Sequence, residues 1–255
     1  MRFGICTGLN NINILENIGC DYIETALNSL VSLNDKEFLE YVQLIKNSNV
    51  KCEAANCFFP GSMKIVGKDI DKNKISEYIK NALHRASLLG VEVFVIGSGK
   101  SRKCSEDWAK EAAVDQFSQV LFEIAEEAKK YDIIATVEPL NKKETNIINS
   151  VSEGLELVKN INHENLKLLA DFYHMRVEQE NMDILKDSSQ YLHHVHIANS
   201  NGRVYPLNKD EDDYEAFFNM LRYIGYNNRV SIEASSSDMK KEGSASLNLL
   251  RQYIL

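Results

Sequence analysis

Residues 133–171 read IIATVEPLNKKETNIINSVSEGLELVKNINHENLKLLAD, and this stretch contains the pattern that decides the fold. It begins with an apolar run, Ile133–Val137, and ends with a second one, Leu166–Ala170. Between them, Ser150 followed by Glu153 predicts the capping-box start of a helix. The apolar stripe of this helix is Leu157, Val158 and Ile161. The stretch therefore predicts a strand, a helix and a second strand.

The same alternation extends in both directions along the chain. Stripes of helical period lie at 75–86, 114–128 and 218–224, and Gly90 and Gly225 are natural stops for the first and third. The eight strand-like runs are Phe3–Thr7, Tyr22–Ala26, Lys51–Ala55, Val91–Ile96, Ile133–Val137, Leu166–Ala170, His193–Ile197 and Val230–Ala234.

Strict alternation of strands and helices predicts a parallel sheet, because parallel strands need crossover connections. Eight units in this chain average about 32 residues each, the size of one βα repeat. An open doubly wound sheet that binds nucleotides has a Gly-rich first turn, which Thr7-Gly8-Leu9-Asn10-Asn11 is not. With only 3 Pro, 12 Gly and no low-complexity linker, residues 1–255 are predicted to form a single (β/α)8 TIM barrel domain.

Composition excludes several classes of protein. The chain is 44% hydrophobic and 26% charged, which is ordinary globular usage and not that of a disordered or collagen-like chain. Its net charge of −8 argues against nucleic-acid binding, and no apolar stretch is long enough to span a membrane. Five cysteines without a Cys-x-x-Cys pair, and the absence of a signal-peptide pattern at the start, predict a reduced, cytoplasmic protein.

Polar residues follow, or end, each of the last four predicted strands. They are Glu138, Asp171, a histidine of the His193–His196 run, and Glu233. The carboxyl ends of barrel strands meet at one face, so four consecutive strands bring one ligand-type side chain each to the same mouth. Any one of them alone is more typical of a helix cap or a hydrogen-bonded core residue. Four coincident positions favour a site.

Three carboxylates and one imidazole suit one divalent metal ion. Mn²⁺ is the favoured ion, with Co²⁺, Mg²⁺ and Zn²⁺ as alternatives. A structural zinc site more often uses thiolates, and no cysteine is near these positions in the sequence. His194 and His196 share one face of their strand, so spacing alone does not choose between them as the ligand.

At these residues the sequence resembles the xylose-isomerase-like superfamily of sugar isomerases and epimerases, and within it the D-tagatose 3-epimerase group. The resemblance covers the repeat pattern of the whole chain and is most specific from Thr136 to Ala234. Four motifs carry it: Glu138-Pro-Leu-Asn141-Lys-Lys-Glu144, Asp171-Phe-Tyr-His174, His194-Val-His196 with Arg203 after it, and Ser231-Ile232-Glu233.

The resemblance implies a metal held by Glu138, Asp171, His196 and Glu233, and sugar oxygens contacted by Glu144, His174 and Arg203. The implied reaction is epimerisation of a ketose or ketose phosphate at C3, with Glu138 and Glu233 as acid and base and an enediolate between the two proton transfers. As alternatives, His174 is a partner of Asp171 and Arg203 forms a loop salt bridge.

Several features leave the substrate open. The loops 56–60 and 97–102 differ from the ketose-epimerase pattern, and Asn199 stands where many relatives carry Asp. Lys100, Arg102 and Lys103 form a basic cluster that either binds a sugar phosphate or is simply solvated. The oligomeric state, including a homo-oligomer, is also open.

Three rival functions remain to be weighed. An inosose dehydratase or a hydroxypyruvate isomerase would use the same metal in a different pocket. A non-catalytic sugar-binding barrel would keep the metal site as a relic. An apurinic endonuclease is disfavoured, because its three zinc ions need early-strand histidines and only His84 precedes the fifth strand, within a predicted helix.

Overall fold

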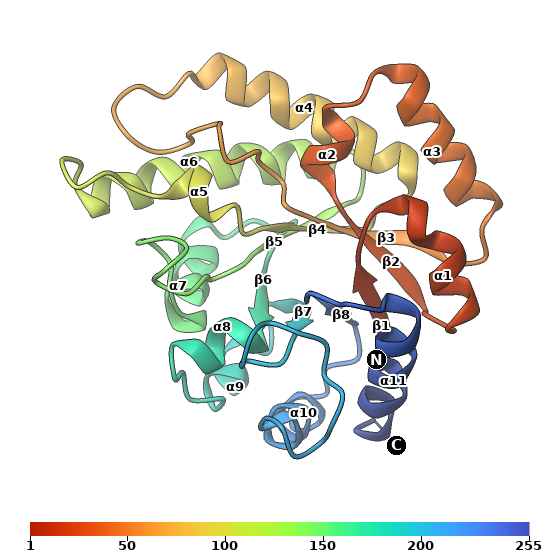
Figure 1. Cartoon of the computed structure of the whole chain (residues 1–255). Coiled ribbons are helices and arrows are strands. Elements are labelled where there is room, and N and C mark those ends of the chain that lie inside the picture. The colour runs from red at the N-terminus through yellow and green to blue at the C-terminus, as the bar shows by residue number, and fades with distance from the viewer. Residues whose placement is uncertain (255) are drawn as a thin grey trace.

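The eight strands close into a barrel in the computed structural model, which describes residues 1–254 (Figure 1). Neighbouring strands follow the order of the sequence, every pair is parallel, and β8 closes the barrel against β1. The predicted (β/α)8 architecture is confirmed. The strands are β1 (Arg2–Cys6), β2 (Tyr22–Ala26), β3 (Lys51–Asn56), β4 (Val93–Ile96), β5 (Ile134–Val137), β6 (Leu166–Asp171), β7 (Leu192–Ile197) and β8 (Arg229–Ile232).

The helices surround the strands and connect them (Figure 1). A 3-10 turn η1 (Leu9–Asn11) precedes α1 (Ile12–Asn17). The longer helices are α3 (Asp35–Asn47), α4 (Lys72–Leu89), α6 (Lys110–Lys129), α7 (Val151–Ile161), α10 (Tyr214–Tyr223) and α11 (Met239–Gln252). Short helices lie within the connections: α2 (Leu27–Val31), α5 (Gly99–Arg102), α8 (Phe172–Val177) and α9 (Ile184–Ser188). None of the helices in residues 1–254 is both long and apolar enough to cross a membrane.

The predicted helix ends are set by local chemistry. Gly90 ends α4 with a φ of 82°, a left-handed conformation that costs glycine little. The Ser150 side chain accepts a hydrogen bond from the Glu153 N–H at the start of α7, at 3.1 Å. The Glu153 carboxylate binds the N–H of Asn149 and not that of Ser150, so only half of the predicted capping box forms.

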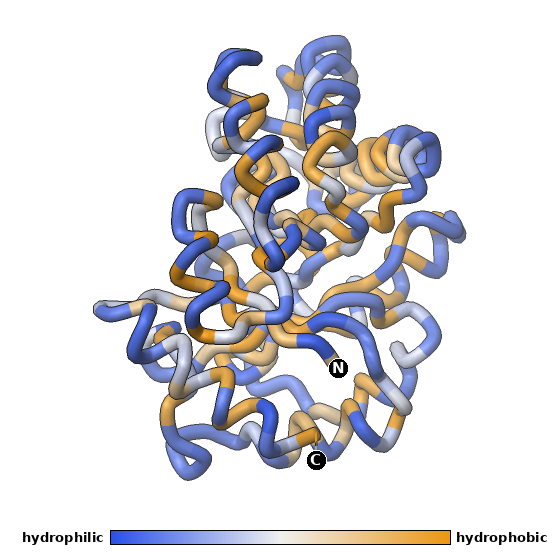
Figure 2. Tube along the Cα trace, turned by 90° about the vertical axis from the view of Figure 1, so that its right-hand side faces the viewer, coloured by the Kyte–Doolittle hydropathy of each residue, from blue (hydrophilic) through white to orange (hydrophobic). Residues whose placement is uncertain are grey.

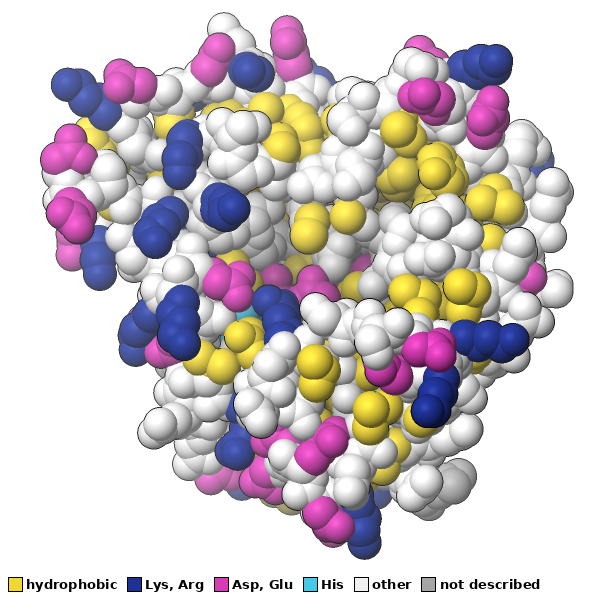
Figure 3. All heavy atoms as spheres, viewed as in Figure 1, with side chains coloured by type: hydrophobic (Ala, Val, Ile, Leu, Met, Phe, Trp, Pro, Cys, Tyr) yellow, Lys and Arg dark blue, Asp and Glu magenta, His cyan; other side chains and the backbone are white. Residues whose placement is uncertain are grey.

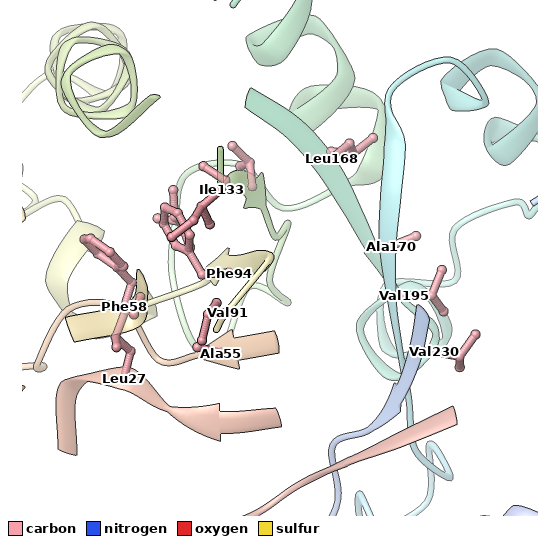
Figure 4. Close-up of a cluster of buried hydrophobic side chains, with 14 of the residues drawn as sticks. Leu27, Ala55, Phe58, Val91, Phe94, Ile133, Leu168, Ala170, Val195 and Val230 are labelled. Carbon is pink, nitrogen blue, oxygen red and sulfur yellow. The ribbon is translucent and has the colours of Figure 1, made fainter. Parts of the chain in front are cut away.

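The main hydrophobic core lies between the barrel and its helices. Alternate strand residues such as Ile23, Val195 and Val230 point outward into it, as the two-residue period of a strand requires. Figure 4 shows part of this layer, in which the rings of Phe58 and Phe94 stack with their centroids 4.9 Å apart. Hydrophobic stretches of the chain accordingly alternate with hydrophilic ones along the trace in Figure 2.

The inside of the barrel is filled at its amino-terminal end. The Tyr22 ring packs there with Ala54 and Val93, and its hydroxyl lies 2.7 Å from Ser231 Oγ. Glycine at position 4 leaves room for that ring, since a Cβ there would lie 2.3 Å from it. Nearer that end, Glu53 is paired with two arginines of β1 and β8. Access from this end is therefore closed, which leaves the carboxyl-terminal end for a site.

Candidate metal centre and active site

The four predicted ligand residues converge at the carboxyl ends of strands β5 to β8. Glu138 and Glu233 follow β5 and β8 directly, Asp171 ends β6, and His196 lies in β7. One nitrogen or oxygen atom from each lies within 4.8 Å of the corresponding atoms of the other three. Figure 3 shows a hollow near the centre of this view, with acidic side chains gathered at its floor. The strand-end spacing in the sequence thus becomes one cluster in space.

The imidazole of His196 is oriented by carboxylates on both of its nitrogens. Nδ1 lies 3.2 Å from Glu138 Oε1 and 3.4 Å from Glu233 Oε2, whereas Nε2 lies 2.9 Å from Glu24 Oε1. His194 also points into the barrel, and its Nε2 lies 2.8 Å from Glu24 Oε2. Geometry therefore separates the two histidines that strand parity could not. His196 faces the strand-end carboxylates, and His194 faces Glu24.

Glu24 is a site residue that the sequence reasoning missed. It lies in β2, is fully buried, and joins both histidines through its two carboxylate oxygens. Burial disfavours its charged form, but the two imidazoles lower its pKa well below the ordinary value. The available signal was a carboxylate inside the apolar run Tyr22–Ala26, because a charge buried in a strand needs a partner.

The carboxylates of Asp171 and Glu233 are each fixed by protein donors. The Tyr173 N–H donates to Asp171 Oδ1 at 2.8 Å, and Asn56 Nδ2 donates to Glu233 Oε1 at 2.7 Å. Arg203 Nη2 donates to Glu233 Oε2 and, at 3.4 Å, to Asp171 Oδ2. Asn56 and Tyr173 had no predicted role, although both lie next to predicted strand ends.

Arg203 joins the predicted ligand set to the predicted sugar-contact set. Its Nη1 donates to Glu144 Oε1 at 3.2 Å, and its guanidinium lies over the Tyr173 ring, 4.7 Å from the centroid. Its backbone adopts a left-handed conformation with a φ of 50°. The loop salt bridge that the sequence suggested is therefore present, and it forms within the hollow and not on a remote surface.

His174 presents a protonated nitrogen without a partner. The Asn141 N–H donates to its Nδ1 at 3.1 Å, so the proton of the neutral ring belongs on Nε2. That Nε2 is buried, has no hydrogen bond among the described residues, and lies 3.5 Å from Asp171 Oδ2. The Asn141 side chain also donates to Glu144 Oε1 at 3.1 Å. Asn141 thus links two predicted sugar contacts, a role its motif position did not suggest.

The site holds acidic groups whose proton affinities differ. Burial and the neighbouring Glu233 raise the pKa of Glu138, and burial raises the pKa of Asp171 to about 6 against the pull of Arg203. Burial also opposes ionisation of Glu233, yet His196 and Arg203 lower its pKa to about 2. For His196, burial is outweighed by the surrounding carboxylates, which raise its pKa well above the ordinary value.

These donors fit a divalent cation. Three carboxylates and an imidazole nitrogen converge on one point, and the imidazole is held by Glu24 on its far side, as metal-bound histidines usually are. The expectation that no cysteine lies nearby is wrong in space, because β1 pairs with β2 and sets Cys6 opposite Glu24. Atoms of Cys6, Glu24 and His196 lie within 4.8 Å of one another. The distance of the cysteines from these residues in the sequence is therefore no argument against Zn²⁺.

The basic cluster after β4 does not form one exposed anion site. Arg102 is fully buried, and its guanidinium donates to backbone carbonyls, including that of Glu138 at 2.8 Å. Only Lys100 and Lys103 keep exposed side chains on this segment. The guanidinium of the cluster is therefore not available to a phosphate.

Comparison with known proteins gives one family. A family model described as xylose isomerase-like TIM barrel matches residues 12–253. An L-ribulose 3-epimerase of Methylomonas sp. strain DH-1 is 28% identical over 225 residues, which is 87% of this chain and 76% of that protein. A 3-dehydro-D-guloside 4-epimerase of Escherichia coli is 29% identical over 113 residues, so that the alignment spans 42% of each chain.

A solved structure extends the likeness to the whole fold. The D-allulose 3-epimerase of Methylomonas sp., in complex with D-allulose, superposes with a TM-score of 0.88 and 21% identity. The match covers 99% of this chain and 97% of that one.

Proposed function

Because the chain belongs to the xylose isomerase-like TIM barrel family, we propose that it is a metal-dependent isomerase that epimerises a ketose at C3. One observation carries the proposal. His196 Nδ1 faces Glu138 and Glu233 while its Nε2 is bound to Glu24, so an oriented nitrogen lies among convergent carboxylates. The relatives named as ketose and ribulose 3-epimerases support the choice of reaction.

Glu138, Asp171, His196 and Glu233 would hold one divalent cation. Mn²⁺ is the ion to test first, with Co²⁺, Mg²⁺ and Zn²⁺ beside it, because the donor set is hard to borderline in character. When bound, such a cation stabilises negative charge on oxygens next to the reacting carbon.

Glu138 and Glu233 would move the proton at C3. They come from β5 and β8, which β6 and β7 separate in the barrel, so their carboxylates approach the centre from different strands. One removes the proton and leaves an enediolate, and the other returns a proton to the opposite face. Which carboxylate acts first depends on which epimer enters the site.

Glu144, His174 and Arg203 would bind the oxygens of the sugar. The Nε2–H of His174, which has no hydrogen bond among residues 1–254 and lies 3.5 Å from Asp171 Oδ2, is a donor of fixed direction, and Arg203 supplies a cationic donor bound to Glu144. We propose a ketose without phosphate as the substrate to test first, since Arg102 is buried against backbone carbonyls. A ketose phosphate is the comparison substrate.

Epimerisation at C4 is the second candidate reaction, supported by the likeness to the 4-epimerase of Escherichia coli. The same two carboxylates would serve a neighbouring carbon of a 3-keto sugar. A dehydratase or isomerase of the same family, and a barrel that binds sugar without turnover, are the remaining alternatives.

Deuterium incorporation from D₂O tests the proposal. A panel of ketoses, ketose phosphates and 3-keto sugars is incubated with Mn²⁺ or with EDTA, and the exchanged carbon is located by NMR. Exchange at C3 that EDTA abolishes is the expected result, and exchange at C4 selects the second candidate. No exchange across the panel despite tight Mn²⁺ binding would overturn the epimerase proposal in favour of a dehydratase or a binding protein.

Substitution at position 233 provides the matched pair for that experiment. Glu233→Ala is expected to abolish exchange and weaken Mn²⁺ binding, because one carboxylate serves both purposes. Glu53→Gln is the control, since Glu53 is a buried carboxylate at the closed end of the barrel, paired with Arg2 and Arg229. Activity in the Glu233→Ala protein equal to that of the control would refute the site assignment.

A further inference from the structure

Glu138 differs from the other two carboxylates in how it is held. Asp171 and Glu233 each accept hydrogen bonds from backbone, amide or guanidinium donors. Within residues 1–254, the only hydrogen bond to the Glu138 carboxylate joins Oε1 to His196. Its other oxygen, Oε2, is positioned by something other than a donor.

The backbone of Gly97 lies against that second oxygen. A Cβ atom at position 97 would be 2.1 Å from Glu138 Oε2 and 3.3 Å from its Cδ, well inside van der Waals contact. Gly97 follows β4, the strand that pairs with β5, which Glu138 follows. The Glu138 carboxylate therefore occupies the space that a side chain at position 97 would fill.

A second glycine brings the same segment against the loop that follows Glu138. A Cβ at Gly99 would lie 3.0 Å from Leu140 Cδ1 and 3.1 Å from the carbonyl oxygen of Glu144. The segment 97–102 is thus packed closely on residues 138–144, which include a predicted ligand and a predicted sugar contact.

Arg102 binds the backbone at both ends of the loop that follows β5. Its side chain is fully buried, and Nη2 donates to the carbonyl of Glu138 at 2.8 Å and to that of Ile148 at 3.4 Å. Nη1 donates to the carbonyl of Ile96 at 3.3 Å, and the guanidinium lies 5.2 Å from the centre of the Phe117 ring. No carboxylate in residues 1–254 forms an ion pair with it. Nε has no hydrogen-bond partner among the described residues, so the two Nη atoms alone tie the ends of β4 and β5 together.

We propose that the segment 97–102 positions Glu138 for metal binding, with Gly97 providing room for the carboxylate and Arg102 fixing the backbone that carries it. The inference rests on the proposed function, because it assigns Glu138 to the metal. Gly97 and Arg102 are positioning residues, since they act through Glu138 and are not among the four candidate ligands Glu138, Asp171, His196 and Glu233. This role differs from both alternatives that the sequence offered for the basic cluster of this segment, a phosphate site and a solvated loop.

Gly97→Ala tests the first part of the proposal through Mn²⁺ affinity, measured by EPR on the metal-free protein. Displacing one carboxylate is expected to weaken binding by about tenfold or more, in the range seen when a ligand's support is lost. The melting temperature of the metal-free protein should change little, because the new Cβ meets the end of a flexible side chain. Gly243→Ala is the control: its Cβ would also meet the end of a side chain, 2.9 Å from Ile18 Cδ1, but away from the metal ligands, so it should leave Mn²⁺ affinity unchanged.

A double-mutant cycle shows whether the effect acts through Glu138. In a Glu138→Ala background, Gly97→Ala should cause no further loss of Mn²⁺ affinity, because no carboxylate remains to be displaced. An equal loss in both backgrounds, or no loss in the wild-type background, would overturn the inference. Absence of Mn²⁺ binding by the wild-type protein would instead refute the proposed function, so the two failures are distinguishable.

Arg102→Met tests the second part against Arg85→Met. Arg85 is also buried, donates to the carbonyls of Leu30 and Leu33 at 2.7 and 2.9 Å, and lies over the Phe38 ring. Both variants should lose thermal stability, but only Arg102→Met should lose Mn²⁺ affinity. Equal affinity in the two variants would contradict the role of Arg102. Where Arg102→Met does not fold, Arg102→Lys, which keeps the charge and loses the planar set of donors, is compared in its place.

Discussion

Glu24 shows how one buried side chain determines what its neighbours can do. Its two oxygens accept from His194 and His196, which fixes the orientation of the His196 ring and leaves Nδ1 directed at Glu138 and Glu233. A carboxylate behind a metal-bound histidine raises the basicity of the ring as well as orienting it. The identity of residue 24 should therefore affect a metal that it does not touch.

Glu24→Gln is expected to lower Mn²⁺ affinity by about 10- to 100-fold and to reduce kcat with it, because the neutral amide orients His196 more weakly. Calorimetric titration of the metal-free protein measures the affinity. Ser231→Ala is the control from the same inner layer: the Ser231 hydroxyl hydrogen-bonds Tyr22 and His194, and in residues 1–254 it forms no hydrogen bond with His196, its neighbour across β7 and β8. Unchanged affinity in Glu24→Gln would show that the strand alone orients the imidazole.

The sequence predicted the site residues that stand at strand ends, and it missed a buried carboxylate whose partners come from another strand. Glu138, Asp171 and Glu233 stand at strand ends, where polar residues are expected to meet. Glu24 stands inside a strand, and its partners come from β7, far away in the sequence. Which buried carboxylate pairs with which histidine depends on the closure of the barrel, and local pattern does not contain that information.

At the scale of elements, the strands were predicted well and their first residues less so. Val91 and Ile133 are apolar and begin predicted strands, yet their N–H groups donate to Ala86 and Ala128 in the preceding helices. They belong to the helix ends, because each completes the last turn before its strand begins. The short helices α2, α5, α8 and α9 were not predicted, since one or two turns are too few to show a period.

The end of α4 provides a test at this scale. Gly90 has a φ of 82°, and a Cβ there would meet nothing within 4 Å, so substitution costs conformational energy alone. Gly90→Ala is expected to lower the free energy of unfolding by about 1 kcal/mol, which is about 2–4 °C in Tm for a chain of this size. Gly90→Asn should lose less, because asparagine adopts this conformation more readily. Equal losses for Ala and Asn, measured by thermal denaturation, would contradict the conformational explanation.

For the whole molecule, barrel closure turns an acidic sequence into a site with a concentrated negative charge. Glu138, Asp171 and Glu233 are brought together around His196. Arg203 donates hydrogen bonds to two of these carboxylates, Asp171 and Glu233. Desolvation of the buried carboxylates of Glu138 and Asp171, together with repulsion from Glu233, is a cost of folding in the metal-free protein, and both effects raise the pKa of these two groups above ordinary values. A cation bound among them should remove that cost and stabilise the fold as a unit.

Addition of Mn²⁺ is therefore expected to raise the Tm of the metal-free protein, with about 2.7 kcal/mol of stabilisation when the free ion is at about 100 times its Kd. The increment should shrink as pH falls. Burial raises the pKa of Asp171 to about 6, so this carboxylate takes up a proton as pH falls through that value. A protonated ligand does not bind the ion, and protons thus compete with Mn²⁺ increasingly below about pH 6.

Thermal denaturation between about pH 8 and about pH 5, with Mn²⁺ and with EDTA, measures that increment. Asp171→Asn distinguishes protonation of a metal ligand from destabilisation of the whole protein by acid. Asn at 171 removes a charged ligand, so the stabilisation by Mn²⁺ should be smaller at every pH. It also removes the proton that competes near pH 6, so the stabilisation should depend less on pH in that range. A pH-independent increment in the wild-type protein would mean that Mn²⁺ binds outside the cluster of Glu138, Asp171, His196 and Glu233, because only ligands that titrate in this range link metal binding to the uptake of protons.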